Sequence, residues 1–128
     1  MTTPGPIGRR TWVIAEGYIP KGGVNSEDRR FLSHEAACML NAGNEIAHVT
    51  IMLYFADRDP VGPYRIDVPP RRTLHLRFND LDDPEPVPRE TDYASVVRSS
   101  VPIVVQHTRL DSRQEALSLM TTLAFADD

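Results

Sequence analysis

The segment VPIVVQHTRLDSR, residues 101–113, begins as an apolar run and ends in polar and titratable side chains. The polar side chains of its second half are Gln106, His107, Thr108, Arg109, Asp111 and Arg113. Successive side chains of a strand point to opposite faces, so His107 and Arg109 are expected on one face. A buried strand that ends this way could form a catalytic site, a ligand contact or a buried ion pair. The ion-pair interpretation predicts a charge-assisted contact between Arg109 and Asp111.

The same segment contains the residue types of a hydrolase triad in Ser112, His107 and Asp111. A catalytic serine normally occupies a strained turn such as G-x-S-x-G, and no such turn surrounds Ser112. Cys38 and His34 are four residues apart on a predicted strand, which separates them by about 13 Å. The sequence therefore predicts that the protein is not an enzyme.

Metal ligands would have to come from single histidines on different strands. The four are His34, His48, His75 and His107, and no H-x-H pair places two of them on one face of a strand. Residues 79–92, NDLDDPEPVPRETD, are acidic but contain no glycine and three prolines, which favours a stiff solvated loop over a calcium site. We therefore expect no metal and no cofactor.

A binding face is a further interpretation, because Trp12 and Glu16 share one side of a predicted strand. An aromatic ring beside charged and amide groups suits a sugar, whose C–H faces stack on the ring while its hydroxyls form hydrogen bonds. The candidate ligand contacts are Trp12, Glu16, Glu35, Arg77, Asn79, His107 and Arg109. The alternative places Trp12 in the core and pairs the charges across strands.

Eleven prolines and seven glycines separate short segments that are rich in β-branched and aromatic residues. The expected strands are residues 11–19, 31–40, 47–55, 64–69, 72–78, 92–99, 101–109 and 118–126. This pattern predicts an all-β fold, a two-sheet β-sandwich or jelly roll of about eight strands. We expect one domain over residues 1–128, with an N-terminal tail at 1–8 and long loops at 20–30 and 79–91.

The C-terminal part of the chain is ambiguous between strand and helix. Ser112 and Glu115 have the spacing of a helix capping box, whereas residues 117–125 alternate apolar and polar side chains. We predict one helical turn followed by a strand, with a continuous helix as the alternative.

Composition narrows the class of partner. The net charge is −4, there is one lysine, and the arginines are scattered, which argues against nucleic-acid binding as the function. No stretch approaches the ~20 apolar residues of a membrane span. One cysteine allows no intramolecular disulfide, which agrees with a reducing compartment. We expect a soluble, cytoplasmic protein.

Five blocks of the chain together resemble the sensory rhodopsin transducer family. They are WVIAEGYIP, FLSHEAACMLNAG, YFADRDPVGPYR, VPPRRTLHLRFNDL and VPIVVQHTRLDSRQ, and the resemblance extends from about residue 8 to residue 126. It implies a cytoplasmic jelly roll that assembles as a homotetramer and has no known catalytic activity. That fold is similar to carbohydrate-binding modules, so the resemblance also allows a small ligand.

The predicted function is that of a non-enzymatic signalling adaptor that binds the cytoplasmic face of a membrane sensory rhodopsin. Cytoplasmic loops of membrane proteins carry an excess of Lys and Arg, so an acidic surface would complement them. The candidate partner contacts are Asp80, Asp82, Asp83 and Glu85. The alternative function is a carbohydrate- or small-metabolite-binding module of jelly-roll type.

Overall fold

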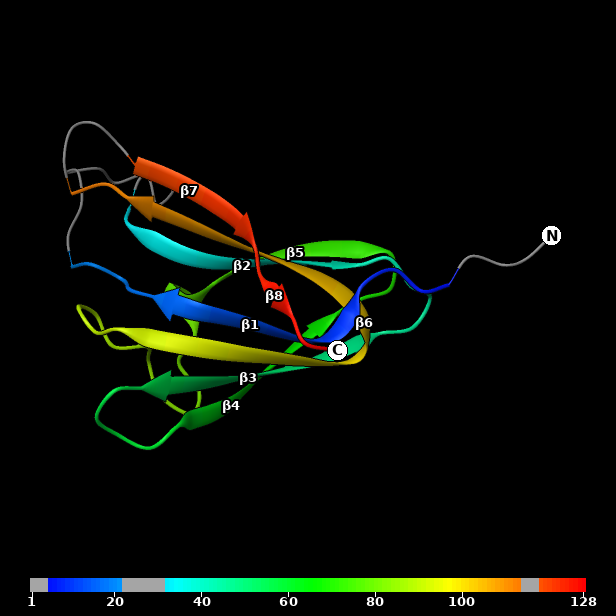
Figure 1. Cartoon of the computed structure of the whole chain (residues 1–128), viewed down its shortest axis with the longest axis horizontal. Helices are drawn as coiled ribbons and strands as arrows, with labels where there is room; N and C mark the ends of the chain where they lie inside the picture. Colours follow the sequence, from blue (N-terminus) through cyan, green and yellow to red (C-terminus); the bar gives the residue numbers. More distant parts are fainter. Residues whose placement is uncertain (1–4, 22–31, 114–117) are drawn as a thin grey trace.

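A computed structural model describes residues 5–21, 32–113 and 118–128, and these residues form eight antiparallel strands (Figure 1). The strands are β1 (Arg9–Gly17), β2 (His34–Asn41), β3 (Ala47–Phe55), β4 (Val61–Val68), β5 (Arg72–Arg77), β6 (Tyr93–Asp111), β7 (Ser118–Leu123) and β8 (Phe125–Ala126). A short 3-10 helix, η2 (Phe78–Asp80), follows β5. The prediction of a single all-β domain of sandwich type is confirmed.

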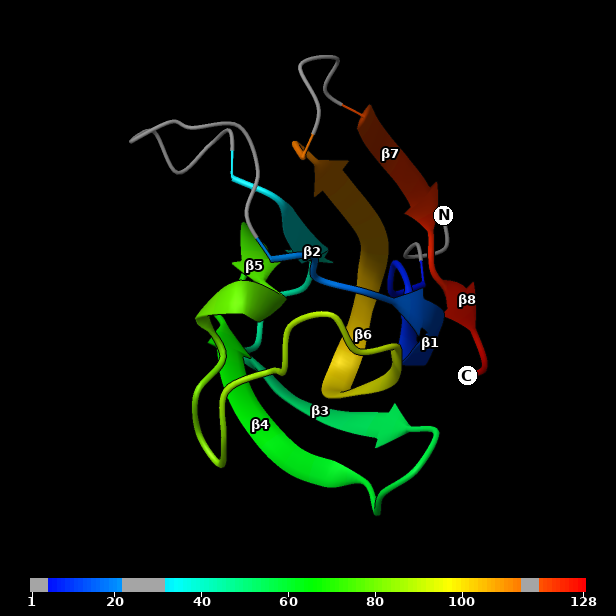
Figure 2. The ribbon, with the colours of Figure 1, turned by 90° about the vertical axis from the view of Figure 1, so that its left-hand side faces the viewer.

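The strand β6 belongs to both sheets of the sandwich (Figure 2). Its first half pairs with β3 on one edge and β1 on the other, within the order β4-β3-β6-β1-β8. Its second half pairs with β2 and β7, and β2 pairs in turn with β5. A single 19-residue strand is therefore shared by the two sheets and fixes the position of one sheet relative to the other.

Two separate strands at 92–99 and 101–109 were predicted here, and this prediction is wrong because β6 is continuous. Pairing with β3 ends at Ser99, and pairing with β2 begins at Val104. Pro102 lies between these points, where the register with β1 also shifts. A proline cannot donate to a ladder but is tolerated at such an irregularity, so it marks the change of sheet and not a strand end.

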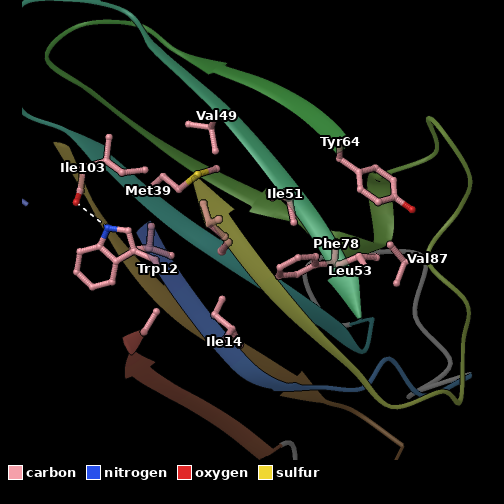
Figure 3. Close-up of a cluster of buried hydrophobic side chains, with 14 of the residues drawn as sticks. Trp12, Ile14, Met39, Val49, Ile51, Leu53, Tyr64, Phe78, Val87 and Ile103 are labelled. Atoms are coloured by element: carbon pink, nitrogen blue, oxygen red, sulfur yellow. Dashed lines mark hydrogen bonds between the residues drawn. The ribbon is translucent and has the colours of Figure 1, made fainter. Parts of the chain in front are cut away.

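The core lies between the two sheets and follows the alternation read from the sequence (Figure 3). In β3, the residues Ala47, Val49, Ile51 and Leu53 are buried, whereas His48 and Tyr54 are exposed. Burial of apolar side chains contributes about 25 cal/mol per Å² removed from water, so this inner face holds the sheets together.

Trp12 on β1 is part of this core and is only 4% exposed. Its indole Nε1 donates to the carbonyl oxygens of Ile103 and Arg9, at 3.0 Å each. The hydrogen bond to Ile103 ties β1 to the middle of β6 (Figure 3). The structure therefore favours the core alternative for Trp12 over a role as an aromatic platform for a ligand.

The C-terminal segment is extended where the structure describes it. Residues 118–123 form β7 along β6, and residues 125–126 form β8 along β1. This agrees with the strand predicted over 118–126 and excludes helix there. The helical turn predicted around Glu115 falls on residues 114–117, which are outside the described residues, and most of the loop predicted at 20–30 is outside them as well.

Candidate functional site

Glu35 on β2 is the centre of a buried polar cluster, and its side chain is fully buried. Its Oε1 accepts hydrogen bonds from the Tyr18 backbone N–H at 2.9 Å and from Arg109 Nε at 2.7 Å. Its Oε2 accepts from His107 Nε2 at 2.5 Å. Tyr18 follows β1 and the other two donors lie on β6, so one carboxylate joins three segments of the chain.

Arg109 lies directly opposite Glu35 in the register of β2 and β6. Its Nη1 is also 3.7 Å from Glu16 Oε1, a longer contact to an exposed carboxylate. Burial opposes the charge of Arg109, but the hydrogen bond and charge of Glu35, helped by the charge of Glu16, raise its pKa above the ordinary value. Arg109 therefore stays cationic.

The predicted pair of Arg109 with Asp111 is wrong. Asp111 accepts hydrogen bonds from Arg113, with the shortest at 2.7 Å from Nη2 to Oδ2. The reason is positional, because Glu35 on the neighbouring strand faces Arg109 from the opposite register position. The hydrogen bond from Arg113 lowers the pKa of Asp111, with the charges of Arg113 and Arg109 adding to the shift.

Asn79, in the helix η2, connects the cluster to the next loop. Its Oδ1 accepts from the backbone N–H of Glu35 at 3.2 Å, and its Nδ2 donates to the carbonyl of Ser33 at 3.1 Å. Arg89 Nη2 donates to the Asn79 carbonyl at 3.4 Å. Asn79 thus ties the start of β2 to the helix η2 and to the loop that contains Arg89.

Two polar atoms near Glu35 are buried without a hydrogen-bond partner among the described residues, the Tyr93 hydroxyl and Arg109 Nη2. Burial raises the pKa of Tyr93 far above its usual range, and the charge of Glu35 adds to the rise while that of Arg109 opposes it. Tyr93 therefore stays neutral. An unpartnered buried polar atom costs about 1–3 kcal/mol.

A cavity of about 440 Å³ adjoins this cluster, between β1 and the β7–β8 segment. Its polar lining includes Glu16, His107 and Arg109. Its apolar lining comes from both sides: Val13, Ile14, Ala15, Met120, Leu123, Ala124 and Phe125. The volume lies within the range of roughly 300–1,000 Å³ that is typical of small-ligand sites.

The seven ligand contacts predicted from the sequence are thus divided by the structure. Glu16, His107 and Arg109 line the cavity. Glu35 does not line it but binds Arg109, and Asn79 in turn binds the backbone of Glu35. Arg77 lies on β5 opposite Ala36 and does not line the cavity, and Trp12 is in the core. Met120, Leu123 and Phe125 also line the cavity but are not among the predicted ligand contacts. The alternation in residues 117–125 includes Leu123 and Phe125 on one apolar face, but it does not include Met120.

The four acidic residues predicted to contact a partner lie on one stretch of loop. Asp80, Asp82 and Asp83 are exposed and line a second hollow of about 350 Å³ with residues 62–65. Glu85 forms an ion pair with Arg58 at 2.9 Å, and its carbonyl accepts from the Tyr64 hydroxyl at 2.7 Å. The backbone of this acidic loop is therefore anchored at Glu85.

Within the described residues, no three His, Cys, Asp or Glu side chains are grouped as metal ligands. His48 instead pairs with Asp67 at 2.9 Å. No helix among those residues is long and apolar enough to cross a membrane.

Comparison with known proteins identifies the family. The family model described as ASRT, Anabaena sensory rhodopsin transducer, matches residues 7–126. The solved structure of the Anabaena sensory rhodopsin transducer is 64% identical, covers 86% of this chain and 95% of its own, and superposes with a TM-score of 0.75. The crystal structure of Thermotoga maritima 1070 is 34% identical, covers 94% of this chain and 97% of its own, and has a TM-score of 0.83. No curated protein matches the chain. This chain belongs to the sensory rhodopsin transducer family.

Proposed function

We propose that this protein is a non-enzymatic signalling adaptor that binds the cytoplasmic face of a membrane sensory rhodopsin and relays its state. The observation that carries this proposal is the 64% identity to the Anabaena sensory rhodopsin transducer over most of both chains. The proposed location is the cytoplasm, where the loops of a membrane receptor offer basic side chains.

The acidic loop is the proposed contact with the receptor. Asp80, Asp82 and Asp83 are exposed, and Glu85 follows on the same anchored backbone. Carboxylates held on a fixed loop complement Lys and Arg on the partner and accelerate the encounter between them.

The experiment is capture of the protein by a sensory rhodopsin in lipid nanodiscs, with empty nanodiscs as the reference. The test variant combines D80N, D82N, D83N and E85Q, and we expect it to bind more weakly than the wild type. The matched control removes four other exposed acidic charges with E45Q, D57N, D59N and D92N. Equal loss in both variants would indicate a net-charge effect and contradict a contact at the acidic loop.

We also propose assembly into a homotetramer. Leu119, Met120, Leu123 and Phe125 on β7 and β8 are each 61–67% exposed in the single chain. Exposed apolar side chains on two neighbouring strands of a folded protein mark an interaction site, and a second subunit would cover the surface of these residues that does not face the cavity.

Binding of a carbohydrate or small metabolite is the second candidate function. The cavity between β1 and the β7–β8 segment supports it, because three predicted ligand contacts line that cavity. A thermal-shift screen tests this candidate, since a ligand at 100 times its dissociation constant stabilises the fold by about 2.7 kcal/mol.

A further inference from the structure

The cavity between β1 and the β7–β8 segment combines apolar walls with a cationic group at one end. Aliphatic side chains and Phe125 supply the walls, while Arg109 and His107 supply the polar end. Sugars require polar groups around much of their surface, and the tryptophan that could stack on a sugar ring is buried in the core. The lining therefore suits a molecule with an apolar body and one charged or polar head.

Arg109 is held in a position to receive that head. Its Nε is bound to the fully buried Glu35, which fixes the guanidinium through a bond of 2.7 Å. Of its terminal nitrogens, Nη1 lies 3.7 Å from the exposed Glu16 Oε1, whereas Nη2 is buried and has no hydrogen-bond partner among the described residues. Nη1 can therefore donate a charge-assisted hydrogen bond to one oxygen of a ligand carboxylate.

Glu16 is the group with which such a ligand would compete. Its side chain is 82% exposed, so it can turn into solvent at little cost, unlike Glu35, which has no exposed surface. A ligand carboxylate would then replace a distant ion pair with a direct charge-assisted hydrogen bond from Nη1.

We propose that this cavity binds an amphipathic carboxylate with an aliphatic tail, anchored on Arg109 with its tail against Ile14, Met120 and Leu123. The inference rests on the second candidate function, the binding of a small metabolite, and names the class of ligand. It is separate from binding of the rhodopsin, for which the acidic loop is the proposed contact. The adaptor would then respond to a metabolite of this class as well as to the rhodopsin.

Isothermal titration calorimetry of the full chain with octanoate tests the proposal, with octanamide and methyl glucoside as comparison ligands. We expect saturable binding of octanoate, about tenfold weaker binding of octanamide because the charged head is lost, and no binding of methyl glucoside. E16Q removes the competing charge and should tighten octanoate binding by about two- to fivefold.

A15F fills the cavity from β1 and should abolish binding of octanoate, whereas A42F on an exposed loop should leave it unchanged. Unchanged melting temperatures would show that both variants fold. Binding of methyl glucoside without octanoate would overturn this inference and leave the metabolite-binding function standing. Binding of neither probe, or equal binding of octanoate and octanamide, would also overturn it, without bearing on capture by the rhodopsin.

Discussion

Glu35 on β2 and Arg109 on β6 lie directly opposite each other in the strand register and are joined by a hydrogen bond of 2.7 Å. Glu35 has no exposed surface, and its other oxygen is occupied by His107. Burying a carboxylate is costly unless it is paired and hydrogen-bonded. The interaction between Glu35 and Arg109 therefore offsets the cost of removing each charge from water. This pair positions Arg109 at the end of the cavity.

A double-mutant cycle should detect that dependence. We expect R109L and E35L each to lower the free energy of unfolding by about 3 kcal/mol, because each leaves a charge without its partner. The double variant should lose clearly less than the sum of the two. The measurement is urea unfolding at a fixed protomer concentration, since assembly would alter apparent stability.

The exposed pair of Asp111 and Arg113 provides the control for this cycle. D111L and R113L should show a coupling energy below about 1 kcal/mol, because exposed ion pairs contribute little. Additivity of the Glu35 and Arg109 variants would contradict the assignment of a coupled buried pair.

Removing the hydroxyl should change the stability of the fold differently at two tyrosines, Tyr93 and Tyr64. Tyr93 buries its hydroxyl without a partner among the described residues, so Y93F should leave stability unchanged or raise it by up to about 1 kcal/mol. The ring contact with Phe78, at 5.5 Å between centroids, is retained. Y64F loses the 2.7 Å bond to the Glu85 carbonyl and should cost about 1 kcal/mol. Thermal unfolding of both variants measures the difference, and a strong loss in Y93F would show that its hydroxyl is bonded after all.

Asp111 predicts a dependence of stability on pH. Its pKa is lowered in the folded protein, chiefly by the hydrogen bond from Arg113, so it stabilises the fold above its unfolded pKa of about 3.9. That contribution disappears as the pH falls through the lower folded value. The melting temperature of D111N should therefore be below that of the wild type at pH 7 and should approach it once the pH is below the lowered pKa of Asp111 in the folded protein. A difference that is constant with pH would refute this.

The exposed apolar side chains of β7 and β8 predict the outcome of a charge substitution. L123E and F125E each place a charge in the proposed subunit contact, so they should shift the protein from tetramer to smaller species. Light scattering coupled to size-exclusion chromatography measures the mass. I46E, an equally drastic change at a 47% exposed residue between β2 and β3, should keep the wild-type mass. A monomeric wild-type protein, or unchanged mass in both β7–β8 variants, would contradict the proposed contact.

Periodicity predicted most of the strands because it is a local property of the chain. The buried and exposed residues of β3 alternate as the apolar and polar residues of its sequence do. Residue type and spacing also selected Glu16, His107 and Arg109, which line the cavity between β1 and the β7–β8 segment. Pairing between distant strands is not local. The partner of Arg109 was misassigned to Asp111 because only the register of β2 against β6 brings Glu35 opposite it.

The same limit explains the other differences. A proline such as Pro102 usually indicates the end of a strand. Here β6 continues through Pro102, because the proline lies where β6 passes from one sheet to the other and the register with β1 shifts. Trp12 shares a predicted face with Glu16, yet the sheet buries its indole and leaves Glu16 exposed, because β1 is irregular between Ile14 and Gly17.

The proposed adaptor function requires this protein to distinguish the dark and illuminated states of a membrane photoreceptor. The direct measurement is its dissociation constant for a sensory rhodopsin in nanodiscs, determined in the dark and under illumination with the same immobilised sample. The adaptor function predicts saturable binding that is absent from empty nanodiscs and an affinity that differs between the two states. Equal affinity in light and dark, or binding no stronger than to empty nanodiscs, would contradict it.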